Sequence, residues 1–360
     1  MGTALGPKPL APPPTAIDLF AGCGGLTLGL KQAGFSVRAA IELSYLAAAT
    51  YAENHPEVTL WNTDIRRVRA TAVQQELCLK KGELDLLAGC PPCEGFSCLR
   101  TLNGGRRIVD DRNDLVLQIL KFVRAFRPKS VMMENVPGLM RNKRFAIFRS
   151  RLERLGYCCN VAVLNAADYC VPQRRRRMIL LAGLGSQIPF GRAARSHRTV
   201  RDAIADLAHT TSTRRDKLHR QTENRGRRIE SMIKAVPKNG GSRSDLPARF
   251  RLRCHQTCSG FKDVYGRMSW DRVAPTITGG CVNPSKGRFL HPSEDRTITL
   301  REAAILQTFP RRYFFSLEKG KFAAAEMIGN ALPPEFIRRH AVTVSKFIRA
   351  LKVGNRNVGY

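Results

Sequence analysis

Short apolar runs alternate with helical patterns through the first half of the chain. Apolar residues recur at helical spacing over Asp114–Phe126 and Asn142–Leu155. Strands are predicted over Thr15–Phe20, Ser36–Glu42, Leu84–Gly89, Ser130–Glu134, Asn160–Leu164 and Met178–Ala182. Strands that alternate with helices favour a sheet covered by helices on both faces. We therefore expect an α/β fold on a doubly wound, mixed sheet whose first strands are parallel.

The character of the sequence changes after about Pro189. Residues 191–253 contain 17 Lys or Arg and six acidic residues, with little clear periodicity. Helical spacing returns over residues 321–347. We expect a disordered lead-in (1–14), a first domain (15–189), a smaller irregular domain (190–320) and a C-terminal segment (321–360) that returns to the first domain.

The chain carries 60 Lys and Arg against 29 Asp and Glu, a formal charge of +31. Such an excess repels itself unless a polyanion neutralises it, so nucleic acid is the expected partner; a solvated basic surface is the alternative. No run of apolar residues is long enough to predict a membrane span. Eleven scattered cysteines indicate reduced thiols in a cytosol.

A glycine-rich turn follows the first predicted strand. It reads Phe20-Ala21-Gly22-Cys23-Gly24-Gly25-Leu26, and Glu42 ends the next strand. Glycines permit a tight turn and the close approach of a ligand, and an acid after the second strand accepts hydrogen bonds from ribose hydroxyls. The pattern predicts a nucleotide-like cofactor. S-adenosylmethionine and a nicotinamide fit it equally, and a simple packing turn is the alternative.

Cys90 and Cys93 flank two prolines after the strand that ends at Gly89. Doubly wound folds place active sites at such strand ends. The pair could be a redox couple, half of a zinc site with Cys254 and Cys258, two core thiols, or could include a nucleophile. A redox pair is typical of a shorter chain. A zinc site would favour two residues between the cysteines of each pair, whereas three separate Cys254 from Cys258.

Two charged groups could assist a nucleophile. Glu134 leaves an apolar strand, so it should be partly buried, which makes it a candidate acid; a helix cap or an ion pair is the alternative. Arginines at alternating positions of Gln173–Arg177 would point to one face and suit an anion or a carbonyl oxygen. A phosphate-binding or solvated basic run would look the same.

Taken in order, these motifs resemble those of the bacterial-type DNA (cytosine-5) methyltransferases over most of the chain. The set comprises Phe20–Leu26, Glu42, Asp64, Pro92-Cys93, Glu134-Asn135-Val136, Gln173-x-Arg175-x-Arg177, Arg272–Ile277 and Gly329–Pro334. The resemblance implies a Rossmann-like, S-adenosylmethionine-dependent methyltransferase domain. It also implies that the small domain reads the DNA target.

The resemblance assigns catalytic roles to four residues. Cys93 would attack carbon 6 of a flipped-out cytosine, and Glu134 would contact the N3 and N4 edge of the base. Arg175 and Arg177 would support the loop and the base oxygen O2. Cys90 is then expected to be a bystander.

The resemblance also implies a cofactor site and partners. S-adenosyl-L-methionine would be surrounded by Phe20, Ala21, Gly22, Gly24, Gly25, Glu42, Leu43, Asp64, Ile65, Pro92, Leu115, Asn330 and Ala331. The substrate would be double-stranded DNA, with no metal and no membrane. We expect a monomer in the bacterial cytoplasm at the nucleoid, either solitary or beside a restriction endonuclease that acts separately.

Two other functions stay open at this point. The same catalytic set could serve a tRNA cytosine-5 methyltransferase. A non-catalytic DNA-binding member of the family is disfavoured because Cys93, Glu134 and Arg175 are all present.

Overall fold

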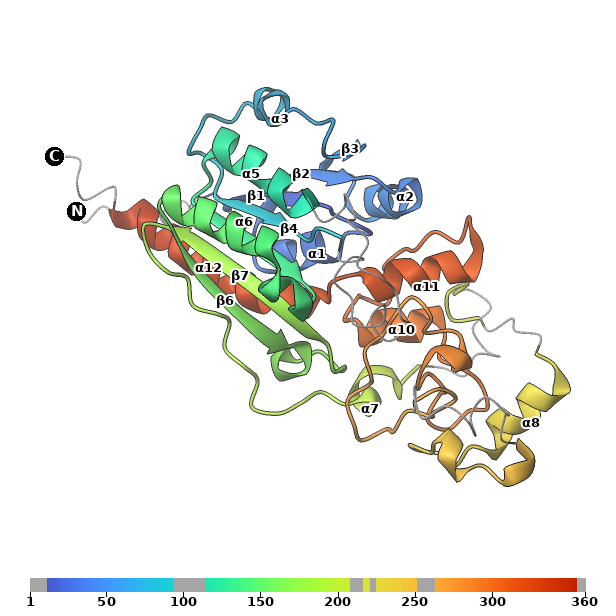
Figure 1. Cartoon of the computed structure of the whole chain (residues 1–360). Coiled ribbons are helices and arrows are strands. Elements are labelled where there is room, and N and C mark those ends of the chain that lie inside the picture. Colours follow the sequence, from blue (N-terminus) through green and yellow to red (C-terminus); the bar gives the residue numbers. More distant parts are fainter. Residues whose placement is uncertain (1–11, 93–113, 208–215, 221–224, 251–262, 355–360) are drawn as a thin grey trace, which may run out of the picture.

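The computed structural model describes residues 12–92, 114–207, 216–220, 225–250 and 263–354. A seven-stranded sheet forms its centre (Figure 1), with strand order β3-β2-β1-β4-β5-β7-β6. The strands are β1 (Thr15–Leu19), β2 (Ser36–Glu42), β3 (Thr59–Asn62), β4 (Leu86–Gly89), β5 (Ser130–Asn135), β6 (Tyr157–Asn165) and β7 (Arg176–Leu184).

The sheet is mixed, as predicted. Strands β1 to β5 pair in parallel, whereas β7 runs antiparallel to both β5 and β6. The six predicted strands are all present, with bounds that differ by up to three residues. Strand β3 was missed, because its four residues carry only two apolar side chains and none is fully buried.

Helices cover both faces of the sheet. One apolar cluster joins the sheet to α3 (Ala70–Glu76), α5 (Leu115–Phe126) and α6 (Lys143–Arg154). A second cluster joins the opposite face to α1 (Gly25–Gln32), α2 (Tyr45–Asn54) and α12 (Pro334–Gly354). The final helix therefore returns to the first part of the chain.

A second unit lies beside the sheet (Figure 1). Its main apolar cluster is built from α7 (Val200–Ile204), α10 (Leu300–Leu306) and α11 (Gly320–Asn330), and it also takes in Cys23 of the glycine turn. A smaller cluster surrounds α8 (Arg227–Ala235). Much of the remaining described chain here is irregular. Such a unit needs polar contacts to replace regular backbone pairing.

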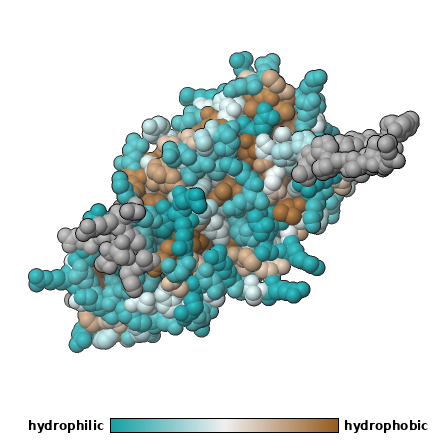
Figure 2. All heavy atoms as spheres, turned by 180° about the vertical axis from the view of Figure 1, so that it is seen from behind, coloured by the Kyte–Doolittle hydropathy of each residue, from teal (hydrophilic) through white to brown (hydrophobic). Residues whose placement is uncertain are grey.

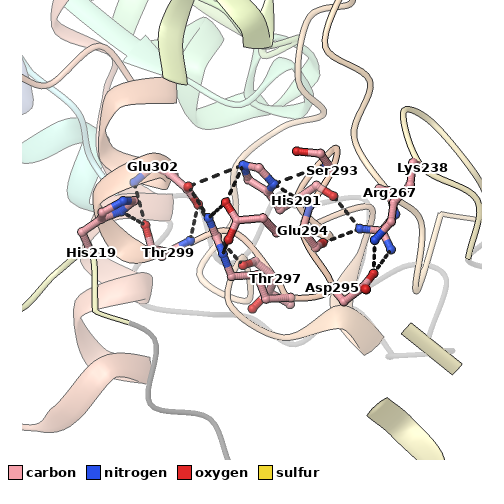
Figure 3. A network of polar contacts seen from close by, with 11 residues as sticks. His219, Lys238, Arg267, His291, Ser293, Glu294, Asp295, Thr297, Thr299 and Glu302 are labelled. Atoms are coloured by element: carbon pink, nitrogen blue, oxygen red, sulfur yellow. Dashed lines mark hydrogen bonds and ion pairs between the residues drawn. The ribbon is translucent and has the colours of Figure 1, made fainter. Parts of the chain in front are cut away.

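Buried ion pairs supply many of those contacts (Figure 3). The Arg267 side chain is fully buried and donates to the carbonyls of Ile233 and His291 and to the Asp295 carboxylate. Burial opposes ionisation of Glu302, but the Arg296 guanidinium outweighs it and holds the pKa of that carboxyl below its usual value.

Hydrophilic side chains cover most of the face in Figure 2, and apolar ones gather there only in small groups. Among the helices in the described part of the chain, none combines the length and apolar character needed to cross a membrane.

The packing of α1 against α12 leaves no room for a side chain at Gly29. A Cβ atom there would lie 2.5 Å from the Pro334 carbonyl oxygen and 2.6 Å from Ile337 Cβ. Gly29→Ala should therefore lower the free energy of unfolding by roughly 1–2 kcal/mol, even though alanine favours helix. Urea denaturation measures this. Gly226→Ala, where a Cβ atom meets nothing, should cost less than about 1 kcal/mol; equal losses would contradict the packing argument.

Candidate active site

The carboxyl ends of the five parallel strands share one edge of the sheet. Strand order reverses between β1 and β4, which lie side by side although β2 and β3 come between them in the sequence. Doubly wound sheets bind ligands in the crevice at such a reversal. The glycine turn follows β1 there, Glu42 ends the adjacent β2, and the Cys90 segment follows β4.

Glu42 is anchored to the glycine turn. Its carboxylate accepts hydrogen bonds from the Gly22 amide at 2.8 Å and from the Ser44 amide at 2.7 Å. Burial raises the pKa of this carboxyl, while the two amides oppose the rise. The chain turns sharply here, with φ of 62° at Phe20 and 57° at Gly22, and a Cβ atom on Gly22 would meet no other atom within 4 Å. Gly22 therefore borders open space beside a fixed carboxylate.

The other two glycines of the turn have a different job. A Cβ atom at Gly24 would come within 2.6 Å of both His55 Nε2 and Tyr313 Oη, and one at Gly25 within 2.4 Å of the Leu332 carbonyl oxygen. These glycines allow protein to pack closely against the turn. Ala21 is buried, and its amide donates to the Ile41 carbonyl.

The remaining predicted cofactor residues have varied surroundings. Leu43 is largely exposed, whereas Ile65 belongs to the core. Asp64 forms an ion pair with Arg66 at 2.6 Å, and this contact lowers its pKa. Pro92 is half-buried and Leu115 begins α5; Asn330, which is exposed, ends α11, and Ala331 follows.

A buried acid below the turn was missed in the sequence. Asp18 is fully buried within β1, and its Oδ2 accepts a hydrogen bond from Thr27 Oγ1 at 2.7 Å. Tyr51 Oη lies 2.8 Å from the same hydroxyl. Burial raises the pKa of Asp18 to about 7, although Thr27 opposes the rise. The available signal was a single acid inside an otherwise apolar strand.

Glu134 is the centre of a second polar group. It is 2% exposed, and its Oε1 lies 2.9 Å from Arg177 Nε in an ion pair. Its Oε2 accepts a hydrogen bond from Cys90 Sγ at 2.9 Å. Cys90, which was expected to be a bystander, thus contacts this carboxylate, because strand register brings its thiol there. Cys93, the predicted nucleophile, lies outside the described residues, as do Cys254 and Cys258.

Arg175 has other partners than Glu134. Its buried guanidinium donates from Nη1 to the Ile277 carbonyl at 3.0 Å and from Nη2 to the Ala331 carbonyl at 3.1 Å. Gln173 reinforces this junction, since it accepts from the Ile277 amide and donates to the Leu306 carbonyl. The structure thus brings Arg177 to Glu134 and uses Arg175 to join distant segments. Within the described ranges, no group of three or more His, Cys, Asp or Glu could hold a metal ion.

Comparison with known proteins decides the family. The model of the C-5 cytosine-specific DNA methylases matches residues 15–346. The chain belongs to this family. It is a DNA cytosine-5 methyltransferase, as the motifs predicted. It is 35% identical to the Type II methylase M.HgiDII of Herpetosiphon aurantiacus, over 93% of this chain and 96% of that protein. It is 34% identical to the Type II methyltransferase M1.BsuMI of Bacillus subtilis, over 88% and 77% respectively.

Solved structures share the fold of this methyltransferase. The Entamoeba histolytica methyltransferase EhMeth aligns with a TM-score of 0.63 and 14% identity, over 93% of this chain and 99% of that one. The S. pombe Dnmt2 methyltransferase aligns with a TM-score of 0.59 and 19% identity, over 94% and 99%. Together with the mixed sheet, these likenesses confirm the predicted Rossmann-like methyltransferase fold.

The raised pKa of Asp18 predicts a specific pH dependence of stability. Because the folded state holds the proton up to about pH 7 and the unfolded chain releases it near 4, unfolding becomes easier as pH rises through this window. Asp18→Asn should remove this contribution, on the order of 3–4 kcal/mol. Between pH 4.5 and 7.5, the free energy of unfolding measured with urea should therefore fall less in Asp18→Asn than in the wild-type protein. Glu76→Gln, on the exposed side of α3, is the control; parallel curves for Asp18→Asn and wild type would contradict the assignment.

Proposed function

We propose that this methyltransferase moves a methyl group from S-adenosylmethionine to carbon 5 of a cytosine flipped out of a specific duplex DNA sequence. The reaction would pass through a covalent bond between Cys93 and carbon 6. The observation that carries the proposal is the buried Glu134 carboxylate, paired with Arg177 at the carboxyl edge of the sheet. It lies on β5, beside the strand that leads to Cys93.

The cofactor proposal rests on the crevice at the glycine turn. Glu42 is held at the strand end by two amides and keeps lone pairs for ribose hydroxyls, while Gly22 leaves space beside it. These features fit S-adenosylmethionine, which when bound supplies an electrophilic methyl group. Phe20, Leu43, Asp64, Ile65, Pro92, Leu115 and Asn330 are proposed to complete the site.

The chemistry explains why a thiol, an acid and a cation are needed. Carbon 5 of cytosine is a weak nucleophile, and thiolate addition at carbon 6 raises its electron density. A cysteine suits this step because its thiolate is accessible near neutral pH and can leave again. Negative charge develops on the ring during addition, so Arg177 near O2 would stabilise it, and Glu134, as the acid at the N3 and N4 edge, would stabilise protonation at N3. Once carbon 5 carries the methyl group, its proton is lost to solvent and Cys93 leaves as a thiolate, which restores the aromatic ring.

Arg175 receives a positioning role in this proposal. Its two carbonyl contacts hold the segments around Ile277 and Ala331 against the start of β7. It would thereby fix the catalytic domain (15–189) relative to the target-recognition unit (190–320), while α12 packs back onto the first domain. Contact with O2 is assigned to Arg177.

Duplex DNA is the proposed substrate. The target base must then leave the stack at a cost of roughly a few kcal/mol, and contacts between the protein and the phosphates can offset that cost. The bacterial Type II relatives support a role in restriction and modification. We infer a monomer in the bacterial cytoplasm that works on the same DNA as a separately acting restriction endonuclease.

Methylation assays test the function directly. Purified protein with S-adenosylmethionine labelled in the methyl group should modify unmethylated duplex DNA and leave tRNA unlabelled. Bisulfite sequencing should locate 5-methylcytosine at one recurring sequence. Cys93→Ser should lower the rate by at least ~10³-fold, since the nucleophile is lost. Label in tRNA alone would favour the RNA enzyme, and an active Cys93→Ser protein would refute the nucleophile.

Two arginines beside the site are expected to contact the DNA backbone. Arg174 and Arg176 are exposed and alternate with the inward Arg175 and Arg177. Each alanine substitution should raise KM for DNA and reduce the slope of log K against log salt by about 0.9, with kcat little changed. Arg124→Ala, at the end of α5 and so at the opposite edge of the sheet, is the matched control. Equal salt slopes for all three variants and wild type would exclude these contacts.

A further inference from the structure

The position of Cys90 follows from strand register. Parallel pairing of β4 with β5 ends at Gly89 opposite Met133, so the next residues along the two strands are Cys90 and Glu134. Paired positions share a face of the sheet, and the Cys90 thiol accordingly lies 2.9 Å from Glu134 Oε2. The contact is a consequence of the sheet itself.

The backbone around Cys90 is held on both sides. Its amide donates to the Leu19 carbonyl at 3.1 Å, which extends the pairing of β4 with β1 by one residue. The carbonyl of Pro91 accepts a hydrogen bond from Asn135 Nδ2 at 2.8 Å. Cys90 is therefore fixed relative to the residue that follows Glu134, and its thiol has one rotatable bond with which to reach or leave the carboxylate.

The chemistry of a thiol differs from that of the other partner of Glu134. The Arg177 guanidinium, 2.9 Å from Oε1, can only donate and so favours the charged carboxylate. A thiol donates weakly to a carboxylate and accepts weakly from a protonated carboxyl group. In the proposed reaction Glu134 faces both the N4 amino donor and the N3 atom of cytosine. Its oxygens must therefore accept a hydrogen bond from N4 and, when protonated, donate one to N3.

We propose that Cys90 is a positioning residue that holds Oε2 of Glu134 in line for the cytosine edge and gives way to the base amino group. This inference rests on the proposed function of Glu134. A thiol is a weak donor, so it orients the carboxylate in the absence of the base and is displaced at little cost when the base enters. An alanine would leave Arg177 to pull the carboxylate towards itself, away from the position of the base.

Single-turnover methylation of duplex DNA tests the proposal. At saturating DNA and S-adenosylmethionine, Cys90→Ala should slow methyl transfer roughly tenfold, about the effect of one hydrogen bond to a charged group. KM for DNA and Kd for the cofactor should stay within about twofold of wild type, because positioning acts on the chemical step. Cys90→Ser, which keeps a donor and acceptor at the same place, should restore the rate to within about threefold.

A double-mutant cycle separates positioning from packing. If Cys90 acts through Glu134, Cys90→Ala should have no further effect in a Glu134→Ala protein. Cys158→Ala removes a half-buried free thiol on β6 and should leave the rate unchanged. Where Cys90→Ala does not fold, as judged by its melting curve, Cys90→Val fills the space without a donor and should be equally slow.

Three results would overturn the proposal. They are a wild-type rate in Cys90→Ala or Cys90→Val, a Cys90→Ser protein as slow as Cys90→Ala, and an undiminished effect of Cys90→Ala in the Glu134→Ala background. A wild-type protein that leaves duplex DNA unmethylated would instead refute the proposed function, so the two failures are distinguishable.

Discussion

The buried guanidinium of Arg175 joins three parts of the chain that are far apart in the sequence. It extends from the segment before β7 to the carbonyls of Ile277 and Ala331, which lie 102 and 156 residues further along. A buried arginine is costly unless its donors find acceptors, and here main-chain carbonyls from both later segments supply them. The same segment carries Arg177, which pairs with Glu134. The geometry of the Glu134 carboxylate is thus tied to the junction between the two units.

The glycine turn depends on the later part of the chain in the same way. Tyr313 Oη donates to the Cys23 carbonyl at 2.7 Å, and His55 Nε2 lies 3.0 Å from the same hydroxyl. Gly24 permits this approach, because any side chain there would occupy the place of the two rings. The loop proposed to hold the cofactor is therefore supported by Tyr313 of the second unit together with His55 of the first. Both proposed sites thus take contacts from both units.

Local pattern predicted the sheet well and the polar contacts poorly, for physical reasons. Strands such as Ser36–Glu42 are apolar runs bounded by turn residues, and this signal is contained in a few neighbouring positions. The role of Arg175 cannot be read from neighbouring positions. Its acceptors are carbonyls whose positions follow only from the packing of the whole chain. The contact of Cys90 is a related case. Glu134 becomes its neighbour only once β4 and β5 are paired in register, and the sequence alone does not give that register.

The distribution of acids explains how a chain of formal charge +31 can fold and still bind a polyanion. Several acids form ion pairs with bases of the same fold. Glu302 pairs with Arg296, Asp216 with Arg301, and Asp85 with Lys129. Each such pair neutralises one acid and one base, so it leaves the net charge unchanged. The surplus of +31 is carried by the remaining Lys and Arg side chains, and like charges among them oppose compaction. A polyanion that binds the folded surface relieves this repulsion, so binding and folding favour one another.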